Sequence, residues 1–156
     1  MPKKTNLTNS NKPIVIEQQH IIIENKRYEV DGKNVVYDPS ENEKEIAIWL
    51  TRKLNKNVTL LPRVIWPQRI KTPDYIIDNE RWDLKTIHSS RKNILFNRLK
   101  NKQEQSSNFV IDITESDLGE NDIVEQLKYL YNNKKFNWLD KIIIKNGDNY
   151  TKINRK

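Results

Sequence analysis

Two aspartates and one lysine within residues 72–87 are the side chains whose types and spacing could do chemistry. Asp74 follows Pro73, and Asp83 precedes Lys85 by two positions. Two carboxylates held close together repel one another, and a hard divalent cation with oxygen ligands relieves that repulsion. A lysine beside such a cation can orient or deprotonate a water molecule and stabilise charge that develops on a phosphate. The chemistry that this set of residues favours is metal-dependent hydrolysis of a phosphodiester.

The segment that carries these residues is predicted to be a β-hairpin. Strict alternation along a strand puts Asp83 and Lys85 on one face and their neighbours in the chain on the other. An apolar strand over residues 75–77 precedes them, and the polar turn at residues 78–80 folds one strand back onto the next. We expect this arrangement to bring Asp74 alongside Asp83 and Lys85.

A metal ion is expected at this hairpin. Mg²⁺ keeps several of its waters, so one or two carboxylates are enough to hold it. Asp74 and Asp83 are predicted to supply two ligands, and the main-chain carbonyl of Leu84 to supply a third. Oxygen donors favour Mg²⁺, with Mn²⁺ or Zn²⁺ as the alternatives. The competing interpretation is a surface hairpin with an ordinary Asp–Lys pair, because so short a pattern arises often by chance in a chain rich in both residues.

Composition points to an anionic partner. The 156 residues carry a net charge of +7, and the pI calculated from the sequence is near 9.5. Such a balance favours nucleic acid first and an acidic protein second, whereas a compositional bias towards Lys, Asn and Ile would explain it without any partner. The chain has no Cys, which excludes disulfides and thiolate metal sites. No apolar run could span a bilayer and no signal-peptide core is present, so we expect a soluble protein.

The length fits one domain. Residues 1–12 are polar and basic and are predicted to be a disordered tail, and residues 13–156 a single domain. Short β-prone runs at residues 14–16, 21–23, 28–30 and 35–37 predict a small N-terminal β-ornament. From Ser40 onward the expected order is α-β-β-β-α-β-α-β-β, with a buried central strand at residues 109–113. The predicted fold is α/β, a central mixed sheet flanked by helices.

Ser40 and Glu43 form a capping-box pattern at the start of the first predicted helix. On a helical wheel Glu43 falls within the apolar stripe of that helix, whereas Glu45 falls outside it. Two interpretations stay open for Glu43. Its side chain either only completes the cap, or adds a third carboxylate aimed at Asp74 and Asp83.

A second predicted helix, over residues 90–107, is rich in bases. Arg91, Arg98, Lys102 and Gln105 lie along one flank of its apolar stripe, which favours a role in contacting substrate over a purely solvated face. Thr86 is a further candidate for contacting phosphate. The two tryptophans at positions 66 and 82 flank the site region and are predicted either to pack or to stack on a base.

The pattern Pro73-Asp74…Asp83-Leu84-Lys85 resembles the PD-(D/E)xK signature of the restriction-endonuclease-like superfamily. The element order over residues 40–113 resembles the αβββαβ core of that superfamily. More narrowly, several stretches resemble the C-terminal tRNA-nuclease toxin domain of CdiA-type contact-dependent inhibition proteins. These stretches are residues 43–47, 58–62, 72–85, 105–113 and 140–144.

The resemblance implies a metal-dependent nuclease that is often paired with a cognate immunity protein. Carried over by position, Asp74 matches the core acid, Asp83 the second acid and Lys85 the lysine. The helix acid matches Glu43 or Glu45, and the wheel favours Glu43. Asp83 stands where many members have Glu, which shortens the reach of the carboxylate by one methylene.

A delivered toxin of this kind would act in the cytoplasm of the target bacterium. The chain begins at its own Met and carries no delivery apparatus, so we expect an excised toxin module, a free-standing protein of a mobile element or a phage protein.

The leading hypothesis is a toxin that cleaves tRNA as a metal-dependent endoribonuclease. The choice of tRNA comes from the resemblance alone. A DNA endonuclease on the same scaffold is the second hypothesis. The third is a nucleic-acid-binding domain without catalysis.

Overall fold

The computed structural model describes residues 12–155, so the predicted tail lies, except for Lys12, outside the described residues. Contacts divide the chain into two compact units, Met1–Glu80 and Arg81–Lys156, and each is described by itself. The single domain predicted over residues 13–156 stays a prediction. None of the helices between residues 12 and 155 has the length and hydropathy of a membrane-spanning segment.

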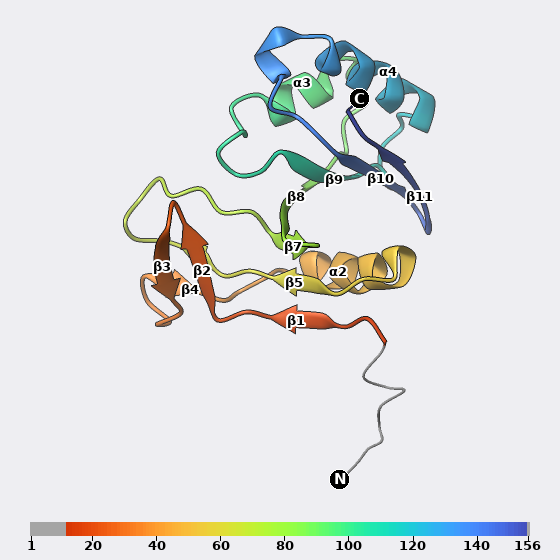
Figure 1. Cartoon of the computed structure of the whole chain (residues 1–156). Helices are drawn as coiled ribbons and strands as arrows, with labels where there is room; N and C mark the ends of the chain where they lie inside the picture. Colours follow the sequence, from red (N-terminus) through yellow and green to blue (C-terminus); the bar gives the residue numbers. More distant parts are fainter. Residues whose placement is uncertain (1–11, 156) are drawn as a thin grey trace. The chain divides into compact units, whose positions relative to one another are not determined.

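The first unit contains a three-stranded sheet with one helix beside it (Figure 1). β1 (Val15–Glu17) runs parallel to β5 (Val58–Leu60), which pairs in antiparallel fashion with β7 (Tyr75–Ile77). α2 (Glu41–Leu54) packs against β5 and β1. Its buried apolar residues recur at helical spacing, as predicted, and they are Ile46, Ala47, Trp49 and Leu50.

Local hydrogen bonds set both ends of α2. The Ser40 hydroxyl accepts from the Glu43 amide at 3.0 Å, and the Glu43 carboxylate accepts from the Ser40 amide at 2.8 Å. These two bonds confirm the predicted capping box, which satisfies amides that have no partner within the helix. At the other end Asn55 adopts a left-handed conformation with a φ of 56°, which ends the helix.

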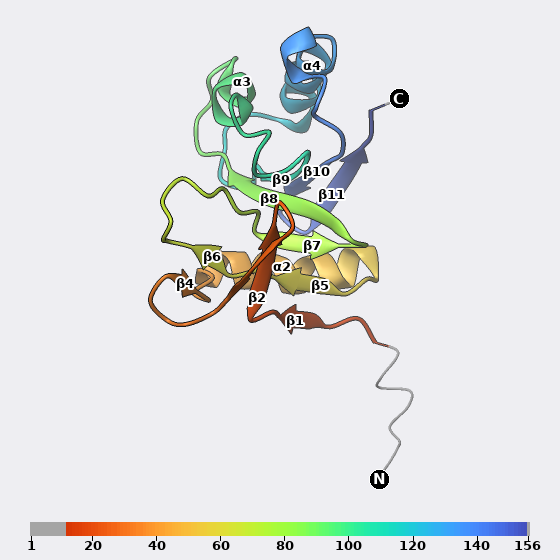
Figure 2. The same ribbon diagram turned by 60° about the vertical axis from the view of Figure 1, so that its left-hand side comes forward.

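The predicted N-terminal β-ornament is present over residues 20–36, and it has its own small core. The run at residues 14–16, predicted as part of it, instead overlaps β1, which pairs with β5. β2 (His20–Ile23) and β3 (Lys26–Glu29) form a hairpin, and β4 (Val35–Val36) pairs with β6 (Arg63–Val64) (Figure 2). Four buried residues hold these strands together: Ile21, Val35, Leu61 and Val64. The ornament is therefore packed onto the segment that follows β5.

The second unit is a four-stranded mixed sheet. β8 (Glu80–Thr86), β9 (Asn108–Asp112) and β10 (Ile142–Asn146) are parallel neighbours, and β11 (Asn149–Ile153) pairs with β10 in antiparallel fashion. The β10–β11 turn is formed by Gly147, at a φ of 63°, and Asp148.

Helices cover one face of this sheet. α3 (Ile94–Leu99), α4 (Glu120–Tyr131) and the 3₁₀ helix η1 (Lys134–Phe136) lie on the same side of β9 and β10 (Figures 1 and 2). The core beneath them joins Leu95 and Leu127 from the helices to Phe109 and Ile111 from β9. β9 is buried at all five positions, which confirms the predicted central strand.

Both units are mixed α/β, in agreement with the predicted fold class. In chain order, α2, β5, β7, β8, α3 and β9 follow the predicted αβββαβ sequence, with the two-residue strand β6 as an addition. A restriction-endonuclease-like core would combine elements of both units, and it stays a prediction.

The helix predicted over residues 90–107 is wrong in length, because α3 covers only Ile94–Leu99. Lys100 has an extended conformation with a ψ of 139°, and Asn101 is left-handed with a φ of 65°. Three and four residues beyond Leu99 the chain has only Lys and Gln, so no apolar stripe continues. The Ser and Asn residues that follow favour turns over helix interiors.

A polar network fixes the register of β8 on β9. The side-chain nitrogen of Asn108 donates to the Arg81 carbonyl at 3.0 Å, and its side-chain oxygen accepts from the Lys141 amide at 3.1 Å. The Ser106 hydroxyl also donates to the Arg81 carbonyl, at 2.6 Å. One buried asparagine therefore joins the starts of three strands, and its partner Arg81 lies two positions before Asp83. A slip of one residue would turn every side chain of β8 to the other face.

We predict that Asn108→Ala lowers the free energy of unfolding by about 1–3 kcal/mol, because it leaves buried backbone groups without partners. Urea denaturation measures this change. Asn97→Ala, on the exposed side of α3, is the matched control and should stay within about 0.5 kcal/mol of wild type. Equal effects of the two substitutions would show that the network does not hold the sheet.

Candidate functional site

Asp83 and Lys85 form a buried ion pair. The Lys85 Nζ lies 2.8 Å from the Asp83 Oδ2, and the lysine and aspartate side chains are 11% and 4% exposed, respectively. The prediction that both residues share one face of a strand is confirmed. Leu84, whose main-chain carbonyl is a predicted metal ligand, lies between them in β8.

Strand pairing tells which face of the sheet the pair occupies. Asp83 is the register partner of Phe109, and Lys85 that of Ile111. Neighbours across a ladder point to the same face, and Phe109 and Ile111 belong to the core beneath α3 and α4. The ion pair therefore continues, along β8, the face that the helices cover.

Burial makes this pair energetically demanding. Removing two charges from water costs several kcal/mol per ion, and their attraction offsets this cost only while both partners stay in place. Loss of one partner would leave an isolated buried charge and destabilise the fold by about 3–5 kcal/mol. A chain under selection for stability alone could fill the same space with apolar side chains. The pair is therefore a candidate for a functional site.

Asp74 lies in the first unit, directly before β7, and its side chain is half-buried. Its main-chain carbonyl accepts a hydrogen bond from the Leu61 amide at 3.2 Å, which ties its backbone to the end of β5. The predicted approach of Asp74 to Asp83 and Lys85 concerns both units together and stays a prediction.

Glu43 is half-buried and Glu45 is exposed, as the helical wheel predicts. The Glu43 carboxylate takes part in the capping box, and the Tyr75 hydroxyl donates to its main-chain carbonyl at 2.8 Å. This hydrogen bond ties the first turn of α2 to the start of β7, next to Asp74. The capping role of Glu43 is thus present, and a catalytic role stays a prediction.

The predicted metal ligands are of the right chemical type for a divalent ion, but they are few. Among residues 12–155, no three His, Asp or Glu side chains gather closely enough to hold a metal ion. The predicted set is smaller, with two carboxylates and the main-chain carbonyl of Leu84. These are hard oxygen donors of the kind that Mg²⁺ takes while it keeps several waters.

The predicted substrate-contacting flank does not form one helical face. Only Arg98 lies in α3, and its Nη1 donates to the Thr86 carbonyl at 2.8 Å. Arg98 therefore fastens α3 to the end of β8. Arg91 is exposed and precedes the helix, whereas Lys102 and Gln105 are half-buried in the turns that follow it.

The two tryptophans differ. Trp82 is 2% exposed, and it lies on the face of β8 opposite the ion pair, so its indole packs and cannot stack on a base. Trp66, in the loop after β6, is 59% exposed. Packing was one of the two interpretations of both residues, and it holds for Trp82 alone.

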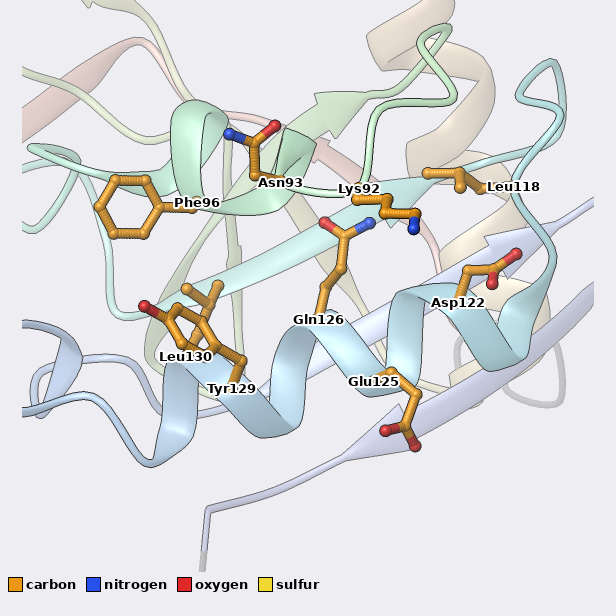
Figure 3. Close-up of a pocket in the computed structure, with 9 residues that line it drawn as sticks. All are labelled: Lys92, Asn93, Phe96, Leu118, Asp122, Glu125, Gln126, Tyr129 and Leu130. Carbon is orange, nitrogen blue, oxygen red and sulfur yellow. The ribbon is translucent and has the colours of Figure 1, made fainter.

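A cavity of about 630 Å³ lies between α3 and α4, and it contains none of the predicted catalytic residues. Figure 3 shows Phe96 of α3 at the same end of the cavity as Tyr129 and Leu130 of α4, with Gln126 between the helices. The Gln126 side chain accepts from the Leu95 amide at 3.0 Å and donates to the Arg91 carbonyl at 3.3 Å. It thus joins the two helices. Carboxylates line the cavity beside one lysine, a mixture that does not suit a polyanion.

Sequence reasoning missed Ser106 and Asn108, the polar residues that hold β8 in register. The signal was a polar residue at the start of an otherwise apolar strand. Asn108 and Ser106 are both buried, and a buried polar group needs partners.

Comparisons with known proteins agree with the fold. A chain of the CdiA-CT/CdiI toxin and immunity complex from Burkholderia pseudomallei superimposes with a TM-score of 0.61 at 22% identity, and the match covers 90% of this chain and 98% of that chain. No curated protein matches the sequence. Residues 71–150 match the family described as contact-dependent growth inhibition CdiA C-terminal domain, and these residues are more than half of the chain. They include Asp74, Asp83 and Lys85. The chain therefore belongs to the CdiA C-terminal domain family of contact-dependent growth inhibition toxins.

Proposed function

We propose that this toxin domain is a metal-dependent endonuclease that cleaves RNA, with tRNA as its substrate. The observation that carries the proposal is the buried ion pair of Asp83 and Lys85, 2.8 Å apart on one face of β8. The two residues stand at the second-acid and lysine positions of the PD-(D/E)xK signature. Asp74 stands at the first-acid position, directly after Pro73.

The roles follow from the chemistry of each group. Asp74, Asp83 and the main-chain carbonyl of Leu84 would hold a divalent ion. A bound Mg²⁺ supplies Lewis-acid polarisation of the phosphate and a water of lowered pKa. The Lys85 ammonium, oriented by the Asp83 carboxylate, donates to the phosphate oxygen on which negative charge develops. Burial strengthens that interaction, because a site with little water screens charge weakly.

A site in which two carboxylates and a lysine surround a divalent ion hydrolyses a phosphodiester with water and needs no 2′-hydroxyl as nucleophile. The site chemistry alone therefore suits RNA and DNA equally. The preference for tRNA comes from the resemblance to tRNA-nuclease toxin domains of the CdiA type. A DNA endonuclease is the alternative substrate class.

A cognate immunity protein is part of the proposal. A similar solved structure is a toxin and immunity complex. The net charge of +7 on this chain would favour an acidic inhibitor as well as a polyanionic substrate.

One observation favours a second candidate, a nucleic-acid-binding domain without catalysis. Lys85 already neutralises Asp83 directly, and the described residues hold no cluster of three metal-ligating side chains. A pair of this kind could serve structure alone. Cleavage and binding assays on the same preparation separate the two functions.

Purified protein should cut total tRNA in the presence of Mg²⁺, and EDTA should abolish the cutting. Gel electrophoresis of tRNA and of supercoiled plasmid, incubated in parallel with Mg²⁺, Mn²⁺ or Zn²⁺, measures this. Plasmid cleavage with intact tRNA would select the DNA endonuclease. Binding of tRNA without cleavage of either nucleic acid, under all three metals, would select the non-catalytic domain.

The double variant Asp83→Asn/Lys85→Gln should lose cleavage and keep a Tm close to that of wild type. Two neutral amides can bond to one another there, so no lone charge is buried. The single variant Lys85→Ala should lose cleavage and also lose about 3–5 kcal/mol of stability, because the Asp83 carboxylate is left unpaired.

Lys128→Ala, at an exposed lysine of α4, is the control and should cut at the wild-type rate. Asp74→Asn should abolish cleavage with little change in Tm, since that side chain is only half-buried. Full activity in the double variant and in Asp74→Asn would remove these residues from the reaction.

Exposed Arg and Lys side chains that bind phosphates should make tRNA binding depend on salt concentration. Removing one cation that binds a phosphate should reduce the slope of log K against log salt by about 0.7–0.9. Arg91→Gln, at an exposed arginine, should flatten the slope by about that amount in filter binding with EDTA present. Glu104→Gln, at an exposed acid of the same unit, should not flatten it. An unchanged slope in Arg91→Gln would place the nucleic acid elsewhere.

A further inference from the structure

Charge is segregated along this chain. Residues 46–73 contain six bases and no acid. The bases are Arg52, Lys53, Lys56, Arg63, Arg69 and Lys71. Residues 103–127 show the opposite pattern, with seven acids and no Lys or Arg. Arg63 is paired with Asp38 and Lys56 with Asp78. The loop between β6 and β7, which closes this stretch, carries Arg69 and Lys71, and cations attract a polyanion.

That loop exposes large apolar side chains. Trp66 is 59% exposed and Ile65 is 44% exposed. Tryptophan is usually highly buried, and an exposed indole leaves a flat π-face in water. Arg69 and Lys71 follow within five residues, and both are exposed. An aromatic ring among cations on one loop is the composition of a surface on which nucleic-acid bases stack.

The loop is held in place by the N-terminal β-ornament. The β4–β6 ladder ends where the loop begins, and the Asn34 carbonyl then accepts from the Ile65 amide at 2.7 Å and from the Trp66 amide at 3.2 Å. Farther along, Ile70 packs against the small core of Ile21, Val35, Leu61 and Val64. The backbone on both sides of Trp66 is therefore anchored while its side chain projects into water.

Two aspartates stabilise the segments on which the loop is held. Asp31 accepts from the amides of Val35, Lys33 and Asn34, and these bonds hold the pKa of its carboxyl below the usual value. Asp38 binds Arg63 through two hydrogen bonds of 2.8 and 2.7 Å, which lower its pKa in the same way. Arg63 thus serves the scaffold, and Arg69 and Lys71 supply the exposed cations on the same loop as Trp66.

We propose that Trp66 is a stacking platform for an unpaired base of a single-stranded nucleic acid, and that Arg69 and Lys71 contact the neighbouring phosphates. This inference rests on the proposed function, since it names a contact of the same substrate. Under this proposal, the N-terminal strands hold the loop that carries Trp66 in a fixed conformation. A pre-organised ring gains affinity because little conformational entropy is lost on binding.

The test is the binding of a fluorescent single-stranded RNA oligonucleotide, measured by anisotropy with EDTA present so that no cleavage occurs. Trp66→Ala should weaken binding by about 5- to 150-fold, the range expected for stacking on one base. Trp66→Phe should retain most of the affinity, whereas Trp66→Leu, which keeps apolar area but has no ring, should behave like Trp66→Ala. Ile48→Ala, at an exposed apolar residue of α2, is the matched control and should bind as wild type does.

Polyphosphate, which has no bases, serves as the second probe. Trp66→Ala should bind polyphosphate as tightly as wild type, because stacking contributes nothing there. Equal losses for both probes would overturn the proposal, since Trp66 would then act through the shape of the loop. Unchanged RNA affinity in Trp66→Ala, in a wild type that binds and cuts RNA, would also overturn it and leave the proposed function intact. A wild type that neither binds nor cuts RNA would overturn both.

Discussion

A lysine and an aspartate buried side by side are stable only while both stay in place, and the second unit is built to keep them there. Asp83 and Lys85 lie two positions apart on β8, so the alternation of the strand puts them on one face. The register of β8 on β9 decides which face that is, and Asn108 and Ser106 pin the register where the strands begin. Arg98 closes the other end of β8 through the Thr86 carbonyl. Polar contacts at both ends thus keep the charged pair in position.

The first unit is built differently. Its helix and three-stranded sheet hold Glu43 and Asp74 through hydrogen bonds to their main-chain carbonyls, and the Tyr75 hydroxyl joins α2 to β7. Its short N-terminal strands pack on the segment after β5 and anchor a basic loop that carries an exposed indole. Under the proposed function, one unit contributes an acid and a surface for the substrate, and the other contributes the charged pair. Because the chain belongs to the CdiA C-terminal domain family, it is a toxin domain.

What could be predicted from the sequence was mostly local. The shared face of Asp83 and Lys85 follows from the period of a strand, and the Ser40–Glu43 cap from side chains three residues apart. The helix predicted over residues 90–107 is too long, because base-rich composition says little about where a helix ends. The φ of 65° at Asn101 and the missing apolar stripe beyond Leu99 decide that. The exposure of Trp66 could not be foreseen either, since it depends on which strands anchor its loop. The distance from Asp74 to Asp83 is a non-local property of the same kind.

Soaking crystals of the whole protein in Mn²⁺ and recording anomalous diffraction would test most directly whether the two aspartates share a metal ion. We expect one anomalous peak within coordination distance of the carboxylates of Asp74 and Asp83, with Lys85 beside it and the peak absent in Asp83→Asn/Lys85→Gln. An intact bond between Lys85 and Asp83 with no peak near either aspartate, at a metal concentration that supports cleavage, would contradict this assignment.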